Sequence, residues 1–503
     1  MTHSGPKSFA LPPSTLTGNP ADGFRSQAFD DTYYSIDNPL GEAEHVFING
    51  NRLIERWRDV FQFSIGELGF GLGRNFLLTV KRFVESGNKG GVLSYLAFES
   101  APVEHARLVE VLGGWPELAP YSEELLALYP PRYAGFHRIS LLGGRVILTL
   151  VFGDARETLS EVSPGRGIDA WFLDGFSPAK NPELWGDEIA LKVAVLSNAC
   201  STFATYSVAS FVKQSFTRAG FFVESAPGFG RKREMLVGTL ATTANKLVEN
   251  INIKESSKRR VLVIGAGLAG AAVANSFAER GFSVAVVDRS SKIASGASGN
   301  IAGVFMPHLS AWPDLMTRFW LAGYYQIIRA IRRFDYCRLG NFQGTEAGVS
   351  KFADCCGVLR LASSARLRSL LQALARLELP DHVARVVDPE EGELLVGTKV
   401  SSSGLWFADG GWLSPEELVR NWLRQVGISC VLNQEIASLR REGGVWIAAD
   451  KEEEEVAQAE IVVVANGVAA AKLSYCEWLP LEPVRGQVLH LEGDKELEKL
   501  KAV

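Results

Sequence analysis

Short apolar runs alternate along this chain with segments of helical character. In the first half, runs rich in apolar and β-branched residues span 61–68, 91–99, 145–152, 168–174 and 201–207. Continuous runs of this kind are typical of strands that a parallel sheet buries on both faces. Two further runs, 220–227 and 233–240, flank the turn GFGRK and predict an antiparallel hairpin at the edge of the sheet.

Two glycine-rich turns between strand and helix lie about 200 residues apart, at 69–73 and 265–270. Each opens its own series of strands and helices, which predicts two α/β domains in tandem. The segment 241–260 is polar and has no clear periodicity, so we interpret it as a linker. The predicted domains are therefore 1–240 and 261–503.

Composition narrows the class of protein. The 503 residues carry a net charge of −5, so any polyanionic partner must be met by a local basic patch. The six cysteines form no CxxC pair and the seven histidines form no ligand-spaced cluster, which argues against disulfides and a metal site. The sequence shows no signal peptide and no apolar stretch of about 18 residues, so we expect a soluble cytoplasmic protein. We also expect a monomer.

The first glycine turn follows an acidic residue. Glu67 precedes Gly69, Gly71 and Gly73 at the end of an apolar strand, and no GK[ST] follows, which excludes a P-loop. Glycines at this position allow the backbone to approach a ligand closely at the carboxyl edge of the sheet.

Two more acids end neighbouring strands. Glu99 is placed to accept hydrogen bonds from ribose hydroxyls, and Asp154 to bind an adenine amino group. Three acids suit a nucleoside that carries a positive sulfonium better than a pyrophosphate, which they would repel. A nicotinamide-binding turn and a turn without a ligand remain the alternatives at this point.

Asp174 emerges from a further apolar strand into the irregular loop GFSP. At this edge it would orient or deprotonate an attacking amine. The alternative is an aspartate that only caps its own loop.

The glycine turn with its three acids resembles the class I S-adenosylmethionine-dependent methyltransferases. Segments covering nearly all of 20–240, above all DGFSPAKNPELW (174–185) and GFGRKREML (228–236), are more specific. They resemble the methyltransferase half of the MnmC family of bifunctional tRNA wobble-uridine modification enzymes. Leu72 and Arg74 depart from the family pattern, which has a small hydroxyl residue and a leucine there, so we expect altered packing under the loop.

This resemblance implies methyl transfer from S-adenosylmethionine to the amine of 5-aminomethyl-uridine in tRNA. It implies Asp174 and Tyr206 as catalytic residues, with Tyr33 and Tyr34 stacking on the extruded base. Lys180 and the basic triplet Arg231, Lys232 and Arg233 are then expected to contact the tRNA. An ordinary solvated turn is the alternative for the triplet.

The second glycine turn is Gly265-x-Gly267-x-x-Gly270 between two apolar strands, and Asp288 follows the second strand. This arrangement places a pyrophosphate at the helix N-terminus and an acid at the ribose, which indicates a bound dinucleotide. The fingerprint alone does not separate FAD from NAD.

Segments 295–307, 409–423, 461–467 and 480–491 resemble the D-amino-acid-oxidase-type flavoproteins and the oxidase half of the same bifunctional family. The resemblance implies FAD, with Ser298 and Asn300 at the cofactor and Arg485 at the substrate. It implies oxidative removal of the carboxymethyl group from 5-carboxymethylaminomethyl-uridine. The expected fold class is a class I, Rossmann-like methyltransferase sheet followed by a Rossmann-type FAD domain with an α+β substrate subdomain.

Flavoproteins of that type continue well beyond the RGQ segment, whereas this chain ends at Val503. From the sequence we therefore expect an incomplete flavin domain that retains FAD poorly. Two other interpretations remain: a methyltransferase whose shortened flavin domain only binds tRNA, and an amine oxidase fused to an unrelated methyltransferase.

Overall fold

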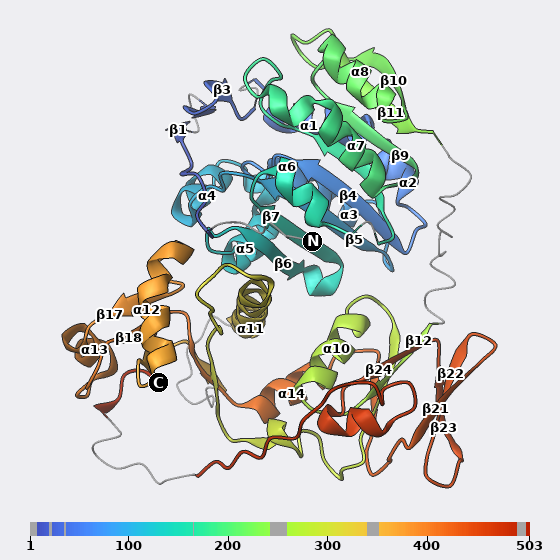
Figure 1. Cartoon of the computed structure of the whole chain (residues 1–503). Helices are drawn as coiled ribbons and strands as arrows, with labels where there is room; N and C mark the ends of the chain where they lie inside the picture. The colour runs from blue at the N-terminus through green and yellow to red at the C-terminus, as the bar shows by residue number, and fades with distance from the viewer. Residues whose placement is uncertain are drawn as a thin grey trace. The chain divides into compact units, whose positions relative to one another are not determined.

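The computed structural model describes residues 8–19, 23–34, 37–163, 165–241, 259–339, 352–489 and 499–503 (Figure 1). Two compact units divide the chain. The first lies within 1–251, 308–341 and 373–380, and the second within 252–307, 342–372 and 381–503. Of the predicted linker 241–260, all but Ala241, Arg259 and Arg260 lies outside the described residues.

An eight-stranded sheet with the order β10-β11-β9-β8-β4-β5-β7-β6 forms the centre of the first unit. Its five middle strands are parallel and are β9 (Ser197–Thr205), β8 (Ile168–Leu173), β4 (Gln62–Leu68), β5 (Val92–Glu99) and β7 (Val146–Phe152). All five correspond to the predicted apolar runs, with ends shifted by a few residues. Burial on both faces explains why these strands read as continuous apolar segments.

Antiparallel strands complete the sheet on both sides. The predicted hairpin is confirmed, since β10 (Phe221–Pro227) pairs antiparallel with β11 (Glu234–Leu240) at one edge. The other edge is β6 (Gly135–Leu141), which pairs antiparallel with β7. Sequence reasoning did not predict β6, because its residues alternate between buried and more exposed positions instead of forming an apolar run.

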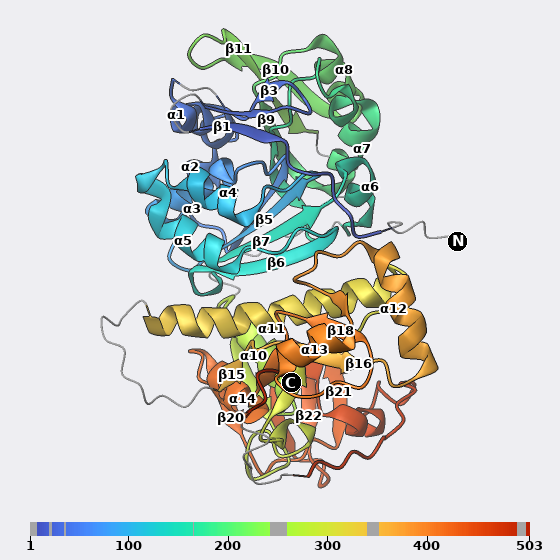
Figure 2. The same cartoon turned by 90° about the vertical axis from the view of Figure 1, so that its left-hand side faces the viewer.

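Helices cover both faces of this sheet, as Figure 2 shows. One face carries α1 (Pro39–Ala43), α2 (Leu53–Arg56), α3 (Arg74–Glu85), α4 (His105–Leu112) and α5 (Ala119–Leu128), and the other α6 (Ala155–Thr158), α7 (Asp187–Leu196) and α8 (Ser210–Arg218). The two cores are separate: Phe76 and Leu125 belong to the first, and Ile189 and Phe216 to the second.

Two further elements belong to the first unit. A small sheet of β1 (Leu16–Asn19), β2 (Gly23–Ser26) and β3 (Asp31–Thr32) precedes the helices. The helix α11 (Leu315–Leu339) packs on α5 and β6. Its buried Arg329 donates hydrogen bonds to the carbonyl oxygens of Leu128 (3.3 Å) and Arg138 (3.2 Å).

The second unit is built on a four-stranded parallel sheet in the order β20 (Ile428–Val431), β13 (Ser283–Val287), β12 (Arg260–Ile264) and β24 (Ile461–Val464). The helix α10 (Leu268–Ala278) connects β12 to β13, as the predicted βαβ unit requires. Three small antiparallel sheets and further helices follow. They comprise β14 (Gly303–Phe305), β15 (Ala353–Asp354), β16 (Val358–Leu361), β17 (Arg385–Val387), β18 (Gly404–Phe407), β19 (Gly411–Leu413), β21 (Ser438–Glu442), β22 (Val445–Ala449), β23 (Glu455–Ala459), α13 (Pro389–Val396) and α14 (Pro415–Leu423). The helix α12 (Ala365–Leu377) begins in the second unit and ends in the segment 373–380, which belongs to the first.

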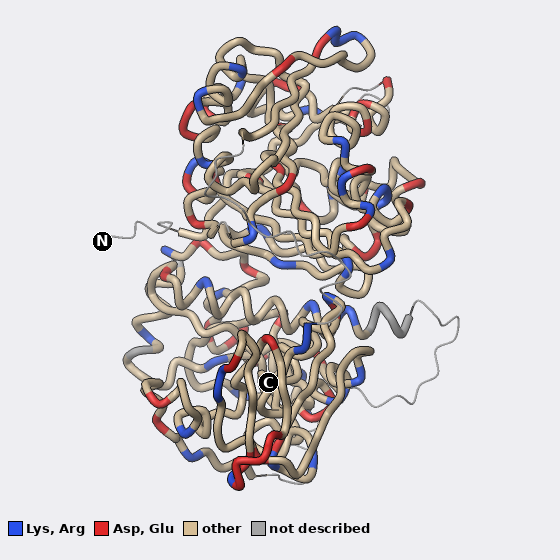
Figure 3. Tube along the Cα trace, turned by 90° about the vertical axis from the view of Figure 1, so that its right-hand side faces the viewer, with Lys and Arg blue, Asp and Glu red and all other residues tan. Residues whose placement is uncertain are grey.

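Basic and acidic positions are interspersed along the chain, as Figure 3 shows. Among the described residues, no helix has the length and apolar character needed to cross a membrane. Within the same ranges, no three His, Cys, Asp or Glu side chains gather in a way that would hold a metal ion. The mixed eight-stranded sheet and the parallel four-stranded sheet agree with the fold class that the sequence predicts.

Candidate functional site

A cavity of about 630 Å³ lies in the first unit at the carboxyl edge of the parallel strands. The segments that follow β4, β5, β7 and β8 line it, and they are 69–72, 99–101, 153–156 and 174–177. Open α/β sheets bind ligands at this edge, where loops from neighbouring strands converge. The remaining walls include Tyr33, Tyr34, Glu42, Tyr206 and Lys232.

Close backbone approach explains two glycines of the first turn. Gly69 has a φ of 90°, and a Cβ there would lie 2.5 Å from the carbonyl oxygen of Asp174. Gly71 has a φ of 54°, and a Cβ there would lie 3.3 Å from the ring of Tyr33. A side chain at either position would therefore separate the loop from its neighbours.

Glu99 holds the glycine turn and borders the cavity. Its carboxylate accepts hydrogen bonds from the backbone N–H groups of Gly71 (2.8 Å) and Ala101 (2.8 Å). Burial raises the pKa of this carboxyl group, while the two backbone hydrogen bonds act in the opposite direction. Each carboxylate oxygen has two acceptor sites, so both oxygens keep capacity for hydroxyl groups of a ligand.

Asp154 also borders the cavity, but it already has a strong partner. Its side chain caps α6 by accepting from the N–H of Arg156 (2.8 Å), and its oxygens accept from Arg156 Nε (3.0 and 2.9 Å). Burial would raise the pKa of Asp154, but the bonds from Arg156 outweigh it and lower the pKa. Arg156 thus lies across the acid that was expected to bind adenine, and its guanidinium also pairs with Glu183.

Glu67 does not face the cavity. Its side chain at the end of β4 is fully buried, and Oε1 accepts a hydrogen bond from Asn75 Nδ2 (2.9 Å). The sequence predicted Glu67 as a cofactor ligand, whereas the structure places it behind the glycine turn.

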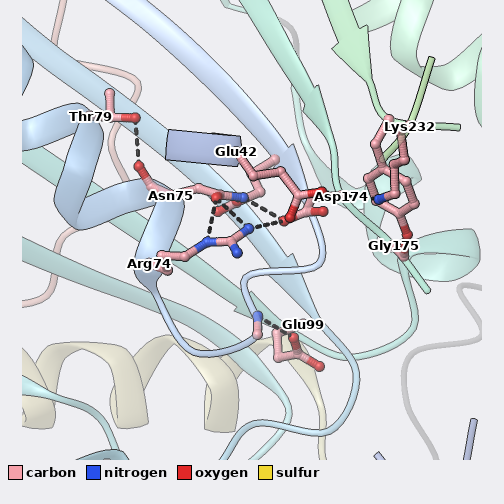
Figure 4. A network of polar contacts seen from close by, with 11 residues as sticks. Glu42, Arg74, Asn75, Thr79, Glu99, Asp174, Gly175 and Lys232 are labelled. Carbon is pink, nitrogen blue, oxygen red and sulfur yellow. Dashed lines mark hydrogen bonds and ion pairs between the residues drawn. The ribbon is translucent and has the colours of Figure 1, made fainter. Parts of the chain in front are cut away.

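Asp174 faces the cavity from the end of β8, with 17% of its side chain exposed. Its Oδ2 accepts a hydrogen bond from Asn75 Nδ2 (2.5 Å) and lies 3.5 Å from Arg74 Nη2, as Figure 4 shows. Burial raises the pKa of Asp174, and the Arg74 charge and the Asn75 hydrogen bond partly offset that shift.

Sequence reasoning missed Asn75 as a site residue and treated Arg74 only as a departure from the family pattern. Arg74 is almost fully buried, lies over the ring of Tyr34 at 5.6 Å, and donates to Asn75 Oδ1 (3.1 and 3.0 Å). A buried arginine in the first turn of a helix needs an acidic partner, and that requirement was the available signal.

Tyr206 and Lys232 form one wall of the cavity. The Tyr206 hydroxyl donates to the carbonyl oxygen of Gly175 (2.5 Å), and Lys232 Nζ lies 4.1 Å from the centroid of the Tyr206 ring. The same ammonium group pairs with Glu42 Oε1 at 3.1 Å. Of the predicted basic triplet, Lys232 therefore turns into the site, whereas the side chain of Arg231 is 93% exposed and Arg233 is exposed.

The predicted tyrosine pair occupies two different places. The ring of Tyr33 lies next to Gly71 and contacts Phe176 edge-on (5.2 Å between centroids). Tyr34 packs instead against Trp115 (5.4 Å). The segment before them is tied to the Asp174 loop, because Asp31 Oδ2 accepts from the N–H of Ser177 (2.9 Å).

Lys180 lies outside the cavity lining, in an exposed ion pair with Asp30 (2.9 Å).

The second unit holds its glycine turn between β12 and α10. Gly265 has a φ of 112°, and a Cβ on Gly270 would lie 1.8 Å from the carbonyl oxygen of Gly265, so strand and helix meet without space for a side chain. Asp288 at the end of β13 accepts from the N–H groups of Ala266 (2.8 Å) and Ser290 (2.8 Å).

Ser298, which was predicted at the cofactor, lies at this turn. The Ser298 hydroxyl accepts from the N–H of Leu268 (3.0 Å) at the start of α10, and a Cβ on Gly267 would lie 3.0 Å from it. The Asn300 side chain donates to the carbonyl oxygen of Ala297 (3.1 Å), and Arg485 lies in an exposed irregular stretch.

Two family models match the chain. One, described as an S-adenosyl-L-methionine-dependent methyltransferase, matches residues 116–241. The other, described as an FAD dependent oxidoreductase, matches residues 260–502. The chain therefore carries both kinds of domain, and S-adenosylmethionine and FAD are the cofactors of these families.

Among solved structures, the chain is similar to MnmC2 from Aquifex aeolicus, with 24% identity and a TM-score of 0.37 over 48% of this chain and 76% of that one. It is also similar to glycine oxidase from Bacillus cereus, with 21% identity and a TM-score of 0.32 over 43% of this chain and 58% of the other.

Curated relatives match most of the chain. The tRNA 5-methylaminomethyl-2-thiouridine biosynthesis bifunctional protein MnmC of Nitrosospira multiformis is 37% identical over 95% of this chain and 75% of its own length. The proteins of the same name from Chromobacterium violaceum and Azoarcus sp. are 36% and 39% identical, over 95% and 92% of this chain and 72% and 71% of their own lengths. With both domain models in chain order and identities of this size, the chain belongs to the MnmC family of bifunctional proteins.

Proposed function

We propose that the chain modifies the wobble uridine of tRNA in two steps. The second unit removes the carboxymethyl group from 5-carboxymethylaminomethyl-uridine, and the first unit then methylates the exposed amine of 5-aminomethyl-uridine. The observation that carries the proposal is the cavity in which Asp174, Glu99 and the glycine turn converge, in a chain of this family.

The cavity walls fit S-adenosylmethionine, which supplies a methyl group on a positively charged sulfur. Glu99 keeps acceptor sites for the ribose hydroxyls, and the loop at Gly71 allows the ligand to lie against the backbone. Carboxylates at this edge favour a cationic ligand over a pyrophosphate. Tyr33 lies at the glycine turn, so we assign it to this ligand in place of the base-stacking role that its sequence position suggested.

Asp174 is the proton acceptor in this proposal. An alkyl amine is protonated at neutral pH and then has no lone pair for attack, so Asp174 must take one proton from it. The amine nitrogen then forms the new N–C bond as the S–C bond breaks, and a second N–H proton leaves to solvent. The raised pKa of Asp174 makes this carboxylate a stronger base than an exposed aspartate.

We assign Tyr206 and Lys232 to binding of the uracil base. Because its hydroxyl is bonded to Gly175, the Tyr206 ring is fixed as a flat wall of the cavity. The Lys232 ammonium above it is a donor for a uracil carbonyl oxygen. Arg231, Arg233, Lys180 and Arg485 remain as proposed phosphate-contacting residues outside this cavity.

The turn at Gly265–Gly270 fits a dinucleotide, since its glycines add no side chains of their own before α10 and Asp288 keeps acceptor capacity for ribose hydroxyls. Bound FAD would supply the hydride acceptor for the C–N unit of the substrate, and water would hydrolyse the resulting imine to release the carboxymethyl group. Within the chain, Ser298 and Gly267 border the pyrophosphate position at the helix start. Asn300 makes its side-chain bond to Ala297, so its role at the cofactor requires a different side-chain orientation.

The substitution Asp174→Asn tests the methylation step. Asn cannot accept a proton from the amine but keeps an oxygen for the Asn75 hydrogen bond. We expect the single-turnover rate of methylation of tRNA that carries 5-aminomethyl-uridine to fall by a factor of about 100 or more. Nucleoside mass spectrometry measures the product.

Titration calorimetry with S-adenosylmethionine is the control, and the dissociation constant of D174N should stay within about threefold of the wild type. An undiminished methylation rate would remove Asp174 from the mechanism.

A further inference from the structure

A second carboxyl group lies behind Asp174, on the side away from the cavity. Glu67 and Asp174 end the adjacent parallel strands β4 and β8, and the two carboxyl groups share one donor. Asn75 Nδ2 donates to Asp174 Oδ2 (2.5 Å), as Figure 4 shows, and to Glu67 Oε1 (2.9 Å), so the amide bridges the two acids.

The bridging amide has one possible orientation. Its oxygen accepts two hydrogen bonds from the Arg74 guanidinium. If the amide were flipped, that oxygen would face two carboxyl oxygens and the NH₂ group would face a guanidinium, which has only donors. Arg74 therefore locks Asn75 with both N–H groups directed at the acids.

The cluster of Arg74, Glu67 and Asp174 is neutral overall if one of the two acids carries a proton. Arg74 is the cation of the cluster, and it lies 3.5 Å from Asp174. Lys232 and Glu42, which pair with each other, face Asp174 from the cavity side, and Tyr95 faces Glu67 from β5. Two ionised acids beside one arginine would leave an uncompensated charge in a buried position, which is costly.

We propose that Glu67 works as a neutral carboxylic acid and that Asn75 is the positioning residue through which it holds Asp174 ionised and oriented for the amine. The inference deepens the proposed methyl transfer and rests on it.

The geometry favours Glu67 as the protonated member of the pair. Glu67 has no exposed surface and no cation within the cluster contacts it, whereas Asp174 is partly exposed and next to Arg74. The buried Glu67 Oε2 and the Tyr95 hydroxyl interact with each other and have no other hydrogen-bond partner, so a carboxyl proton on Glu67 can donate to the Tyr95 oxygen. Burial, followed by the Asp174 charge, raises the pKa of Glu67 well above its ordinary value, in agreement with this assignment.

The first test is Glu67→Gln, which is neutral and close in shape to a protonated glutamate. Gln keeps an oxygen for the Asn75 donor and places an NH₂ group where the carboxyl O–H would be. We expect a single-turnover methylation rate within about threefold of the wild type at pH 7. A rate as low as that of D174N would show that the Glu67 charge is needed, and would overturn the inference.

The second test is Asn75→Leu, which removes the bridge at similar volume. Activity requires ionised Asp174, and the Asn75 hydrogen bond stabilises that ion, so its loss raises the pKa of Asp174. The acid limb of the pH–rate profile should therefore move to higher pH by about one unit. At pH values below that limb the rate should fall about tenfold.

The dissociation constant for S-adenosylmethionine, measured by calorimetry, should remain within about threefold in N75L. If N75L does not fold, Asn75→Ser gives the same readout, since a serine hydroxyl has one proton and cannot donate to both acids. An unchanged rate together with an unchanged acid limb in the folded variant would overturn the positioning role. If D174N is inactive and N75L is normal, only this inference fails; if D174N is fully active, the proposed mechanism fails with it.

Discussion

At Gly71 the first turn comes close to the ring of Tyr33. A Cβ there would meet the Tyr33 ring at 3.3 Å, and its N–H is bonded to Glu99. Both contacts border the cavity, so the absence of a side chain serves the ligand as well as the turn.

The substitution Gly71→Ala tests whether the absence of a side chain at this position matters for ligand binding. Alanine at a φ of 54° strains the backbone by roughly 1 kcal/mol, and its methyl group displaces Tyr33. We expect the dissociation constant for S-adenosylmethionine to rise about tenfold by calorimetry. Gly87→Ala is the matched control, because Gly87 also has a positive φ of 78° but nothing lies within 4 Å of its Cβ position. Equal dissociation constants in both variants would contradict the role of Gly71.

Candidate site residues were predictable where they lie at the end of an apolar strand. Glu99 and Asp174 directly follow apolar runs, so their place at the carboxyl edge follows from the sequence. Asn75 was not predictable, since its partners Glu67 and Asp174 lie 8 and 99 positions away and only the fold brings them together. The inward turn of Lys232 depends likewise on Glu42, 190 positions earlier.

Among the elements, the hairpin β10–β11 carries basic side chains in two different environments. Its turn exposes Arg231 and Arg233 to solvent and directs Lys232 into the cavity. The hairpin itself was predictable from two apolar runs around a glycine turn, whereas the edge strand β6 was not, because its alternation of buried and exposed residues gives a weaker signal. The different environments of the three basic residues were not predictable, because they depend on side-chain positions that only the folded structure gives.

Replacing Arg231 and Arg233 by glutamine should weaken tRNA binding and reduce its salt dependence. If each arginine contacts a phosphate, the slope of log K against log salt becomes shallower by roughly 1.4 to 1.8. Filter binding at several salt concentrations measures the slope. Lys399→Gln, at an exposed position in the second unit, is the control for loss of charge alone. A slope that does not change in the double variant would assign the turn to ordinary solvated surface.

At the scale of the whole chain, each unit has its own core and its own ligand turn. The residues of the first turn belong to cores built on the eight-stranded sheet, and those of the second pack on the four-stranded sheet. The tandem α/β organisation was predictable, because two glycine turns in separate strand and helix series mark it. The assignment of 308–341 and 373–380 to the first unit was not, since it depends on contacts such as those of Arg329.

Damage to one site should therefore leave the other intact. Gly265→Val introduces a Cβ at a φ of 112°, 2.6 Å from the carbonyl oxygen of Ala465. We expect less bound flavin per chain by visible absorbance and loss of conversion of 5-carboxymethylaminomethyl-uridine. Methylation of tRNA supplied with 5-aminomethyl-uridine should stay within about twofold, and D174N should show the opposite pattern, with flavin content unchanged. Loss of both activities in G265V would contradict separate sites.

The stretch from Gly69 to Asn75 joins two tasks on seven consecutive residues. Its first part lines the cavity that we propose for the methyl donor, and its last residue, Asn75, donates a hydrogen bond to Asp174, the proposed proton acceptor. A compound that displaces this stretch would therefore slow proton removal from the amine and also weaken binding of the methyl donor. Inhibitors shaped to wedge beneath Gly71 should for that reason slow the chemical step even when saturating donor restores occupancy.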